Sequence, residues 1–495
     1  MTTQKNLLLL LLTVVLLNLS LPPFDLGFLR YIALIPLLFF IAKAEDSLPF
    51  VYRAATVWIT SFLFLLWQLT GLLGLHPLDW GGIESKLASL SITFGIWIGI
   101  SFFLSLASFP LLLSFHRRFF IYFPLMWVLW EFFRSHLYSI IILGPGSAIA
   151  DIFPFGFLGF SVHTSSSLLA LSPFLGVFGF SLLIALINLL FYHLLFGKQP
   201  LNKKMRWSII ASIVVVLAAI EWGQWPKTYP NNSEESIGII VLNEKNPVQF
   251  KYTDEYFKQI FPRQLSILEK AFSNHPDANI VVFSENSQFL RTLEKRLSST
   301  PKETKKLLFS NPEHPRVIID GDYDSINDVS RIRVRTNTDK EYLVYKEILM
   351  PLGEYQPYFF KQAADFLGQE EFYNQLAAQK HTQSVPGGIK TIETKLGKIA
   401  VISCSEILSP AVYTQIQKES PDFVVQQQRL AHFHDSTKGF YQTLALSKMR
   451  AATLRKFIVG SVDGSGFSYV ISPDGELIAK SNHAKGYLYV ELPRK

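Results

Sequence analysis

Cysteine is nearly absent from this sequence: Cys404 is the only one among 495 residues. The chain therefore forms no internal disulfide, which excludes a disulfide-stapled fold and gives no information on the redox compartment. The sequence also contains neither an internal repeat nor a low-complexity segment. The net charge of +7 is modest, and basic residues in so apolar a chain set membrane orientation more often than they bind nucleic acid. We therefore expect no nucleic-acid partner.

Charged residues are scarce before about residue 225, where long uncharged runs alternate with short polar breaks. A bilayer crossing needs roughly 20 apolar residues. Seven intervals meet this need: 6–22, 26–43, 51–74, 88–115, 119–143, 168–197 and 206–225. Beyond residue 225 charges are frequent, and strand and helix patterns take over. The sequence thus predicts a multispanning α-helical membrane domain over residues 1–225 and an α/β domain over residues 226–495.

Basic residues are concentrated in alternate breaks between these intervals, beginning with the N-terminus. They are Lys5, then Lys43 and Arg53, then Arg117 and Arg118, and finally Lys198, Lys203, Lys204 and Arg206. Because basic loops face the cytoplasm, the N-terminus is expected there. Seven crossings then place the α/β domain on the extracytoplasmic side.

Two charged residues interrupt the interval 119–143. Glu131 and Arg134 lie three positions apart, on one face of a helix at membrane depth. They can form a local ion pair that neutralises both charges, or a polar patch that faces a substrate cavity, since intramembrane charges seldom face lipid. Glycines and prolines break the next segment, 144–167, which predicts an outer loop or re-entrant segment beside the α/β domain.

Short apolar, β-branched runs recur after residue 235 and alternate with helical patterns. Strands are expected at 236–242, 279–283, 316–320, 332–335, 341–345, 397–403, 422–425, 456–462 and 467–471, and helices at 256–272 and 436–454. This alternation is typical of a layered α/β architecture in which helices cover the sheets.

Three residues with complementary chemistry close or follow expected strands. Cys404 ends the strand 397–403, just before a helix whose N-terminus is expected to favour the thiolate. Glu285 and Lys346 follow the strands 279–283 and 341–345. A carboxylate can accept the thiol proton, and an ammonium can stabilise a tetrahedral oxyanion. Taken singly, such a cysteine is usually a small core residue, and a strand-end Glu or Lys is usually a solvated loop residue.

The set Glu285, Lys346 and Cys404 resembles the Glu–Lys–Cys triad of the carbon–nitrogen hydrolase (nitrilase) superfamily. With membrane helices ahead of it, the chain is similar to the bacterial apolipoprotein N-acyltransferase family. The most specific strings are Tyr345-Lys346, the later Pro351-Leu352-Gly353-Glu354, and Cys404-Ser405-Glu406. Glu131 with Arg134 also resembles family positions in the membrane half.

The resemblance implies a nitrilase-like α-β-β-α sandwich that transfers an acyl chain from a phospholipid to the N-terminal amine of a diacylglyceryl lipoprotein. It implies that Cys404 carries the acyl chain as a thioester, that Glu285 is the base and then the acid, and that Lys346 stabilises the oxyanion. Glu354 and Glu406 match acids that support the site. It further implies no cofactor or metal, a monomer, and a place in the bacterial cytoplasmic (inner) membrane, with the catalytic domain outside the cytoplasm.

Several segments depart from the family pattern. The residue after the nucleophile is Ser405 rather than Tyr, and the residue before the base is Ser284 rather than Pro. The segments 426–430, 450–453 and 462–466 differ as well, which predicts altered pocket walls around an intact triad. Three alternatives remain open: a membrane-tethered amidase in which water resolves the thioester, a catalytically silent relative that binds lipid or lipoprotein, and a multispanning transporter.

Overall fold

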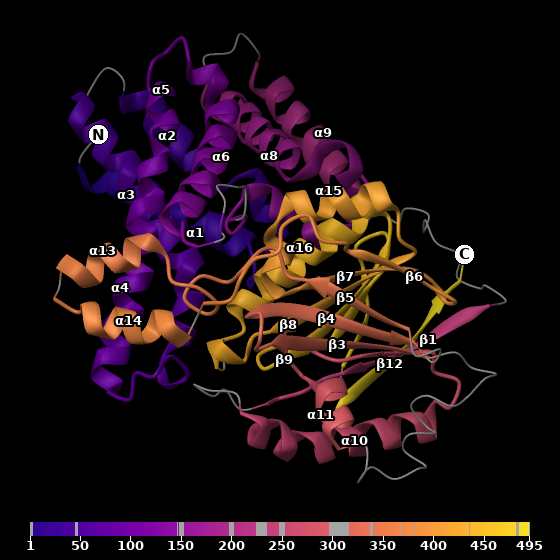
Figure 1. Cartoon of the computed structure of the whole chain (residues 1–495). Helices are drawn as coiled ribbons and strands as arrows, with labels where there is room; N and C mark the ends of the chain where they lie inside the picture. Colours follow the sequence, from indigo (N-terminus) through magenta and orange to yellow (C-terminus); the bar gives the residue numbers. More distant parts are fainter. Residues whose placement is uncertain are drawn as a thin grey trace.

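The structure is a computed structural model that divides into a helical bundle and two stacked β-sheets (Figure 1). It describes residues 3–44, 48–145, 147, 153–197, 202–223, 235–246, 253–296, 316–336, 340–366, 368–379, 381–434, 436–481 and 485–494. The predicted domain boundary at residues 225 and 226 lies outside these ranges.

Helices lie in each of the seven apolar intervals. They are α1 (Thr3–Ser20), α2 (Ile35–Ala44), α3 (Phe50–Gln68), α4 (Lys86–Ser105) followed by α5 (Pro110–Leu113), α6 (Phe123–Ile141), α8 (Ser172–Phe196) and α9 (Lys203–Trp222). Four described stretches are long and apolar enough to cross a membrane: Gly27–Ala44, Phe50–Leu75, Lys86–Leu113 and Ser172–Phe196. Many of their apolar side chains point outward and are exposed, as is typical of lipid-facing helices. The number of crossings stays a prediction.

The segment after α6 is irregular where it is described, as its glycines and prolines indicate. It continues into the 3-10 helix η6 (Leu158–Thr164) and the short helix α7 (Ser166–Leu169). η6 packs against α8 of the bundle and against α16 (Lys438–Leu454) of the α/β domain. The predicted place of this segment beside the α/β domain is therefore confirmed for residues 158–164, whereas an outer or re-entrant position in the membrane stays a prediction.

Two six-stranded sheets form the α/β domain, and both are mixed. The first has the order β12-β1-β2-β3-β4-β5 and the second the order β11-β10-β9-β8-β7-β6. The strands of the first are β1 (Ser236–Leu242), β2 (Ile280–Val282), β3 (Val317–Asp324), β4 (Val329–Thr336), β5 (Glu341–Tyr345) and β12 (Tyr487–Pro493). Those of the second are β6 (Thr391–Thr394), β7 (Gly397–Ser403), β8 (Phe423–Arg429), β9 (Phe457–Asp463), β10 (Tyr469–Ile471) and β11 (Leu477–Lys480). The nine predicted strands are present, whereas β6, β11 and β12 were not predicted.

Alternating side chains build the layers of this sandwich. In β7, Ile399 and Val401 face the core between the sheets, whereas Ala400 and Ile402 face helices on the outside, because successive side chains of a strand point to opposite faces. Helices α10 (Asp254–Asn274) and α11 (Phe289–Lys295) cover the first sheet, and α15 (Pro410–Glu419) and α16 cover the second (Figure 1). The predicted α-β-β-α sandwich is confirmed.

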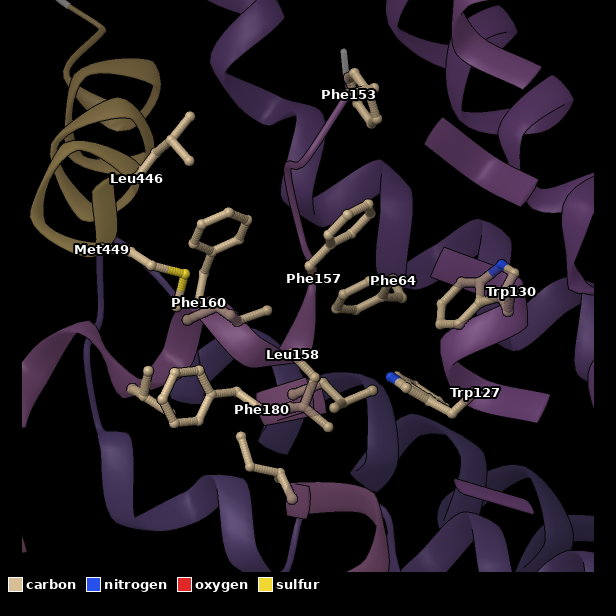
Figure 2. Packing of buried hydrophobic residues seen from close by; sticks show 14 of the residues in the cluster. Phe64, Trp127, Trp130, Phe153, Phe157, Leu158, Phe160, Phe180, Leu446 and Met449 are labelled. Atoms are coloured by element: carbon tan, nitrogen blue, oxygen red, sulfur yellow. The ribbon is translucent and has the colours of Figure 1, made fainter. Parts of the chain in front are cut away.

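The outer core of the second sheet is continuous with the core of the bundle. One buried cluster includes Ile402 and Val424 of the sheet, Leu446 and Met449 of α16, and Phe160 of η6, and it extends to the bundle helices. Figure 2 shows Met449 beside Phe160, with the ring of Phe157 and the side chains of the bundle next to them. The α/β domain is therefore packed onto the bundle rather than only linked to it.

Polar contacts reinforce this junction at the 3-10 helix η2 (Leu69–Leu75). The Lys438 ammonium donates to the hydroxyl of Thr70 at 2.9 Å, and the Gln442 amide donates to the Gln68 carbonyl at 3.1 Å. Gly74 lets the backbones meet closely, because a Cβ atom there would clash with Ser436 and lie 2.6 Å from the Phe433 carbonyl oxygen.

We expect Gly74→Val to lower the free energy of unfolding by about 1–3 kcal/mol, because the added side chain forces apart two packed backbones. Thermal unfolding of the full chain in detergent micelles, followed by circular dichroism, measures the effect. Gly95→Val in α4 is the matched control, since a Cβ atom at Gly95 meets nothing within 4 Å. Equal melting temperatures for the two variants would contradict the close junction.

Candidate active site

The structure brings Glu285, Lys346 and Cys404 together at one edge of the sandwich. Glu285 follows β2, Lys346 follows β5 and Cys404 follows β7. The Lys346 Nζ atom lies 2.8 Å from Oε1 of Glu285, and the same oxygen accepts a hydrogen bond at 2.7 Å from the hydroxyl of Ser403, the residue before Cys404. The charges of Glu285 and Lys346 both act on the pKa of the Cys404 thiol. An acid, an amine and a thiol far apart in the sequence therefore lie together at one site.

A second carboxylate completes the surroundings of Lys346. Oε2 of Glu354 lies 2.8 Å from Nζ and accepts a hydrogen bond from the Met350 backbone N–H at 2.7 Å. Burial opposes the charge on Lys346, but Glu285, Glu354 and Cys404 outweigh it and raise the pKa of the amine well above its usual value. The ammonium form is thus strongly favoured.

The two carboxyl groups differ in proton affinity because their surroundings differ. Burial acts against the ionisation of Glu285, but the Lys346 ammonium and hydrogen bonds, including one from the Ser403 hydroxyl at 2.7 Å, hold its pKa below the usual value. Burial and the nearby charge of Glu285 raise the pKa of Glu354 despite its contact with Lys346. Glu285 is therefore the group that is ionised and ready to accept a proton.

Cys404 is half-buried and adopts a left-handed backbone conformation with φ +34°. Burial, and after it the negative charge of Glu285, raise the pKa of its thiol, although Lys346 lowers it. The expectation that a following helix favours the thiolate is wrong. The element is a five-residue 3-10 helix, η7 (Cys404–Leu408), and desolvation dominates. The raised pKa favours the neutral thiol form of Cys404.

Glu406 is buried behind Cys404 and accepts hydrogen bonds from two separate stretches of main chain. Its Oε2 accepts from the Ser403 N–H at 2.9 Å and its Oε1 from the Glu347 N–H at 2.8 Å. The first contact and the reciprocal one of the Ser403 side chain form a capping box at the start of η7. Ser405, where the family pattern has Tyr, donates its hydroxyl to the Ile348 carbonyl at 2.5 Å.

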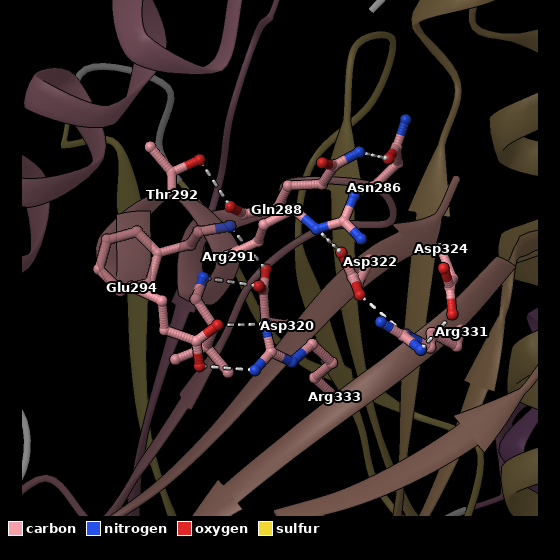
Figure 3. Close-up of polar contacts among 12 residues, drawn as sticks. Asn286, Gln288, Arg291, Thr292, Glu294, Asp320, Asp322, Asp324, Arg331 and Arg333 are labelled. Atoms are coloured by element: carbon pink, nitrogen blue, oxygen red, sulfur yellow. Dashed lines mark hydrogen bonds and ion pairs between the residues drawn. The ribbon is translucent and has the colours of Figure 1, made fainter. Parts of the chain in front are cut away.

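A tight turn carries Glu285, and polar contacts hold this turn in place. Asn286 and Gln288 have positive φ values of 55° and 49°. The buried Asp320 carboxylate accepts from the Leu290 N–H at 2.8 Å and from the Ser287 hydroxyl; Figure 3 shows Asp320 beside Gln288 and α11. Burial raises the pKa of Asp320 to about 7. A side chain at Gly321 would clash with this turn.

The membrane pair lies elsewhere. Glu131 and Arg134 are completely buried in α6. Glu131 accepts hydrogen bonds from the Leu158 N–H at 2.7 Å and the Trp127 indole at 3.0 Å. Arg134 donates to the Phe155 carbonyl at 3.1 Å and lies 4.8 Å from the Trp130 ring centroid. Among the described residues, no recorded contact of either side chain reaches the site around Cys404.

Sequence reasoning missed three residues that hold the predicted set in place. Ser403 binds Glu285, Asp320 fixes the turn after it, and the buried Lys390 pairs with Glu406. Of these three, only Ser403 could have been found from the sequence, because it lies next to the cysteine. Within the described ranges no group of three or more His, Cys, Asp or Glu side chains could hold a metal ion.

We expect the rate at which iodoacetamide alkylates Cys404 to rise about tenfold per pH unit from pH 7 to pH 9, because the thiolate attacks and its pKa lies above this range. Cys404 is the only cysteine, so intact mass reports its modification alone. Glu285→Gln removes a charge that raises the thiol pKa and is expected to speed alkylation at pH 8. A rate independent of pH would indicate a preformed thiolate instead.

Comparison with known proteins accounts for most of the chain. Residues 14–190 match the apolipoprotein N-acyltransferase N-terminal domain, and residues 326–495 match the carbon-nitrogen hydrolase domain. The second match contains Lys346 and Cys404 and begins after Glu285.

Two relatives carry the same name. An apolipoprotein N-acyltransferase of Coxiella burnetii is 29% identical over 182 residues, which are 35% of this chain and 33% of the relative. One of Geobacter metallireducens is 21% identical over 365 residues, 72% of this chain and 64% of the relative. The chain thus spans about a third of the first and less than two thirds of the second.

Among solved structures, Saccharomyces cerevisiae Nit3, a member of branch 10 of the nitrilase superfamily, is similar to 53% of this chain over 91% of its own length. The identity is 14% and the TM-score 0.37. The two domain matches, in the order in which they occur, settle the family. This chain is a divergent member of the apolipoprotein N-acyltransferase family, in the nitrilase superfamily.

Proposed function

We propose that this protein transfers a fatty acyl group from a phospholipid to the N-terminal amine of the S-diacylglyceryl cysteine of bacterial lipoproteins. The observation that carries the proposal is the convergence of a buried acid, ammonium and thiol in a domain packed onto apolar helices. The names of the relatives supply the substrate class. The activity is a covalent, two-step acyl transfer.

In the first step Glu285 accepts the thiol proton as the sulfur of Cys404 attacks the ester carbonyl. The negative charge that develops on the carbonyl oxygen is stabilised by the ammonium of Lys346. Collapse of the tetrahedral intermediate breaks the ester bond and leaves a thioester on Cys404. The departing alcohol, a lysophospholipid, takes the proton from Glu285.

In the second step the lipoprotein amine attacks the thioester, and Glu285 accepts the proton that the amine loses. The carbon–sulfur bond breaks, the amide forms, and the thiol regains its proton from Glu285. Glu354 keeps Lys346 charged, and Glu406 fixes the turn that carries the nucleophile. No cofactor or metal takes part in this scheme.

The proposal places the protein as a monomer in the bacterial inner membrane, with seven crossings over residues 1–225 and the catalytic domain, residues 226–495, outside the cytoplasm. The distribution of basic residues supports this orientation. Both substrates are lipids, and a domain packed onto the bundle lies near the surface that holds them. We assign Glu131 and Arg134 to the wall of the substrate site in the membrane half, on the basis of their buried charge.

The test is to incubate the full-length protein with phospholipid in micelles and to measure the intact mass. We expect an added acyl group on the wild type and none on Cys404→Ala. Lys346→Met is expected to slow acylation by at least about 10²-fold, because the oxyanion loses its charged partner. A diacylated lipopeptide added afterwards should take up the acyl group on its amine.

Each other outcome points to an alternative. Discharge of the thioester only to water would favour an amidase, which the match to a carbon-nitrogen hydrolase domain makes the second candidate. A wild-type protein that gains no mass would contradict the transferase and favour a silent lipid-binding relative. A Lys346→Met variant that reacts at the wild-type rate would exclude the oxyanion role.

A further inference from the structure

A fourth charged side chain, Lys390, is buried behind the site. It lies just before β6 and is 0% exposed. Burying an unpaired ammonium is costly, so such a residue needs strong partners. Its Nζ atom lies 2.5 Å from Oε1 of Glu406, which is itself 1% exposed, and donates to the Tyr345 carbonyl at 2.8 Å.

The partners of this ion pair are the main-chain neighbours of two active-site residues. Tyr345 and Glu347, which flank Lys346, bind Lys390 and Glu406 respectively. Ser403, which precedes Cys404, binds the other oxygen of Glu406. One buried pair therefore connects the end of β5 to the end of β7, and so connects the chain that carries the amine to the chain that carries the thiol.

We propose that Lys390 is a positioning residue which, through Glu406, sets the spacing between the Lys346 ammonium and the Cys404 thiol. The inference rests on the proposed acyl transfer, since it assigns Lys390 to the same site. A buried ion pair adds little stability compared with apolar residues of similar volume. Its role here is therefore to fix the relative positions of the two chain segments that it joins. A displacement of about 1 Å in such a site can cost roughly 10²-fold in rate.

Two variants of the full-length protein separate positioning from folding. Lys390→Met leaves Glu406 buried without its counter-ion, and both the melting temperature and the rate of thioester formation should fall. Lys390→Met/Glu406→Gln removes both charges, and the melting temperature should rise above that of Lys390→Met, because no uncompensated buried charge remains. The introduced glutamine amide supplies only one acceptor oxygen for the two N–H groups of Ser403 and Glu347. The connection between the ends of β5 and β7 is therefore not restored.

The expected result for the double variant is acylation about 10²-fold slower at saturating phospholipid, with an unchanged half-saturating concentration. Lys398→Met is the matched control: this lysine, at the other end of β7, donates to the Glu419 carbonyl at 2.6 Å. It should acylate as the wild type does. A double variant that regains both stability and the full rate would overturn the inference.

If the wild type forms no thioester, the proposed function fails, and alkylation by iodoacetamide still tests the spacing. The Lys346 ammonium lowers the pKa of the Cys404 thiol, so moving the two apart should slow alkylation of the double variant at pH 8. Alkylation at the wild-type rate in the double variant would show that Lys390 does not set this distance.

Discussion

The ammonium of Lys346 lies between the carboxylates of Glu285 and Glu354, and the rest of the active site is arranged around it. Two buried carboxylates without a cation between them would repel each other, and one would take up a proton. With the cation in place, Glu285 keeps its charge close to a thiol that keeps its proton. The site therefore holds an ionised carboxylate close to a protonated thiol, which is the starting state that the proposed proton transfer needs.

To bring Glu285, Lys346 and Cys404 together, the ends of three strands from two different sheets must lie close to one another. β2 and β5 belong to the first sheet and β7 to the second, so no local motif can set their distances. The structure fixes them through buried polar contacts between loops: Ser403 with Glu285, Glu406 with the N–H groups of Glu347 and Ser403, and Asp320 with the turn after Glu285. Such contacts are directional, unlike the apolar packing of the sheets.

The features that the sequence predicted correctly are those that depend on residues close together in the chain. The strand that ends at Cys404 and the strand that ends before Lys346 were predicted because β-branched and apolar runs mark them. β12 was missed because its place beside β1 depends on a pairing more than 240 residues away in the chain. Lys390 was missed because a single lysine before a short strand has the same pattern whether it is solvated or buried. The thiol pKa was predicted in the wrong direction because burial is a property of the assembled pocket.

The continuous core of α16, η6 and the bundle has a consequence for the proposed reaction with lipid. Where a catalytic head is joined to its anchor by a linker, thermal motion varies its height above the bilayer. Here the shared buried core holds the α/β domain in one position relative to the bundle. Under the proposed acyl transfer, this fixed position limits which bonds of a lipid held by the bundle can reach the sulfur of Cys404.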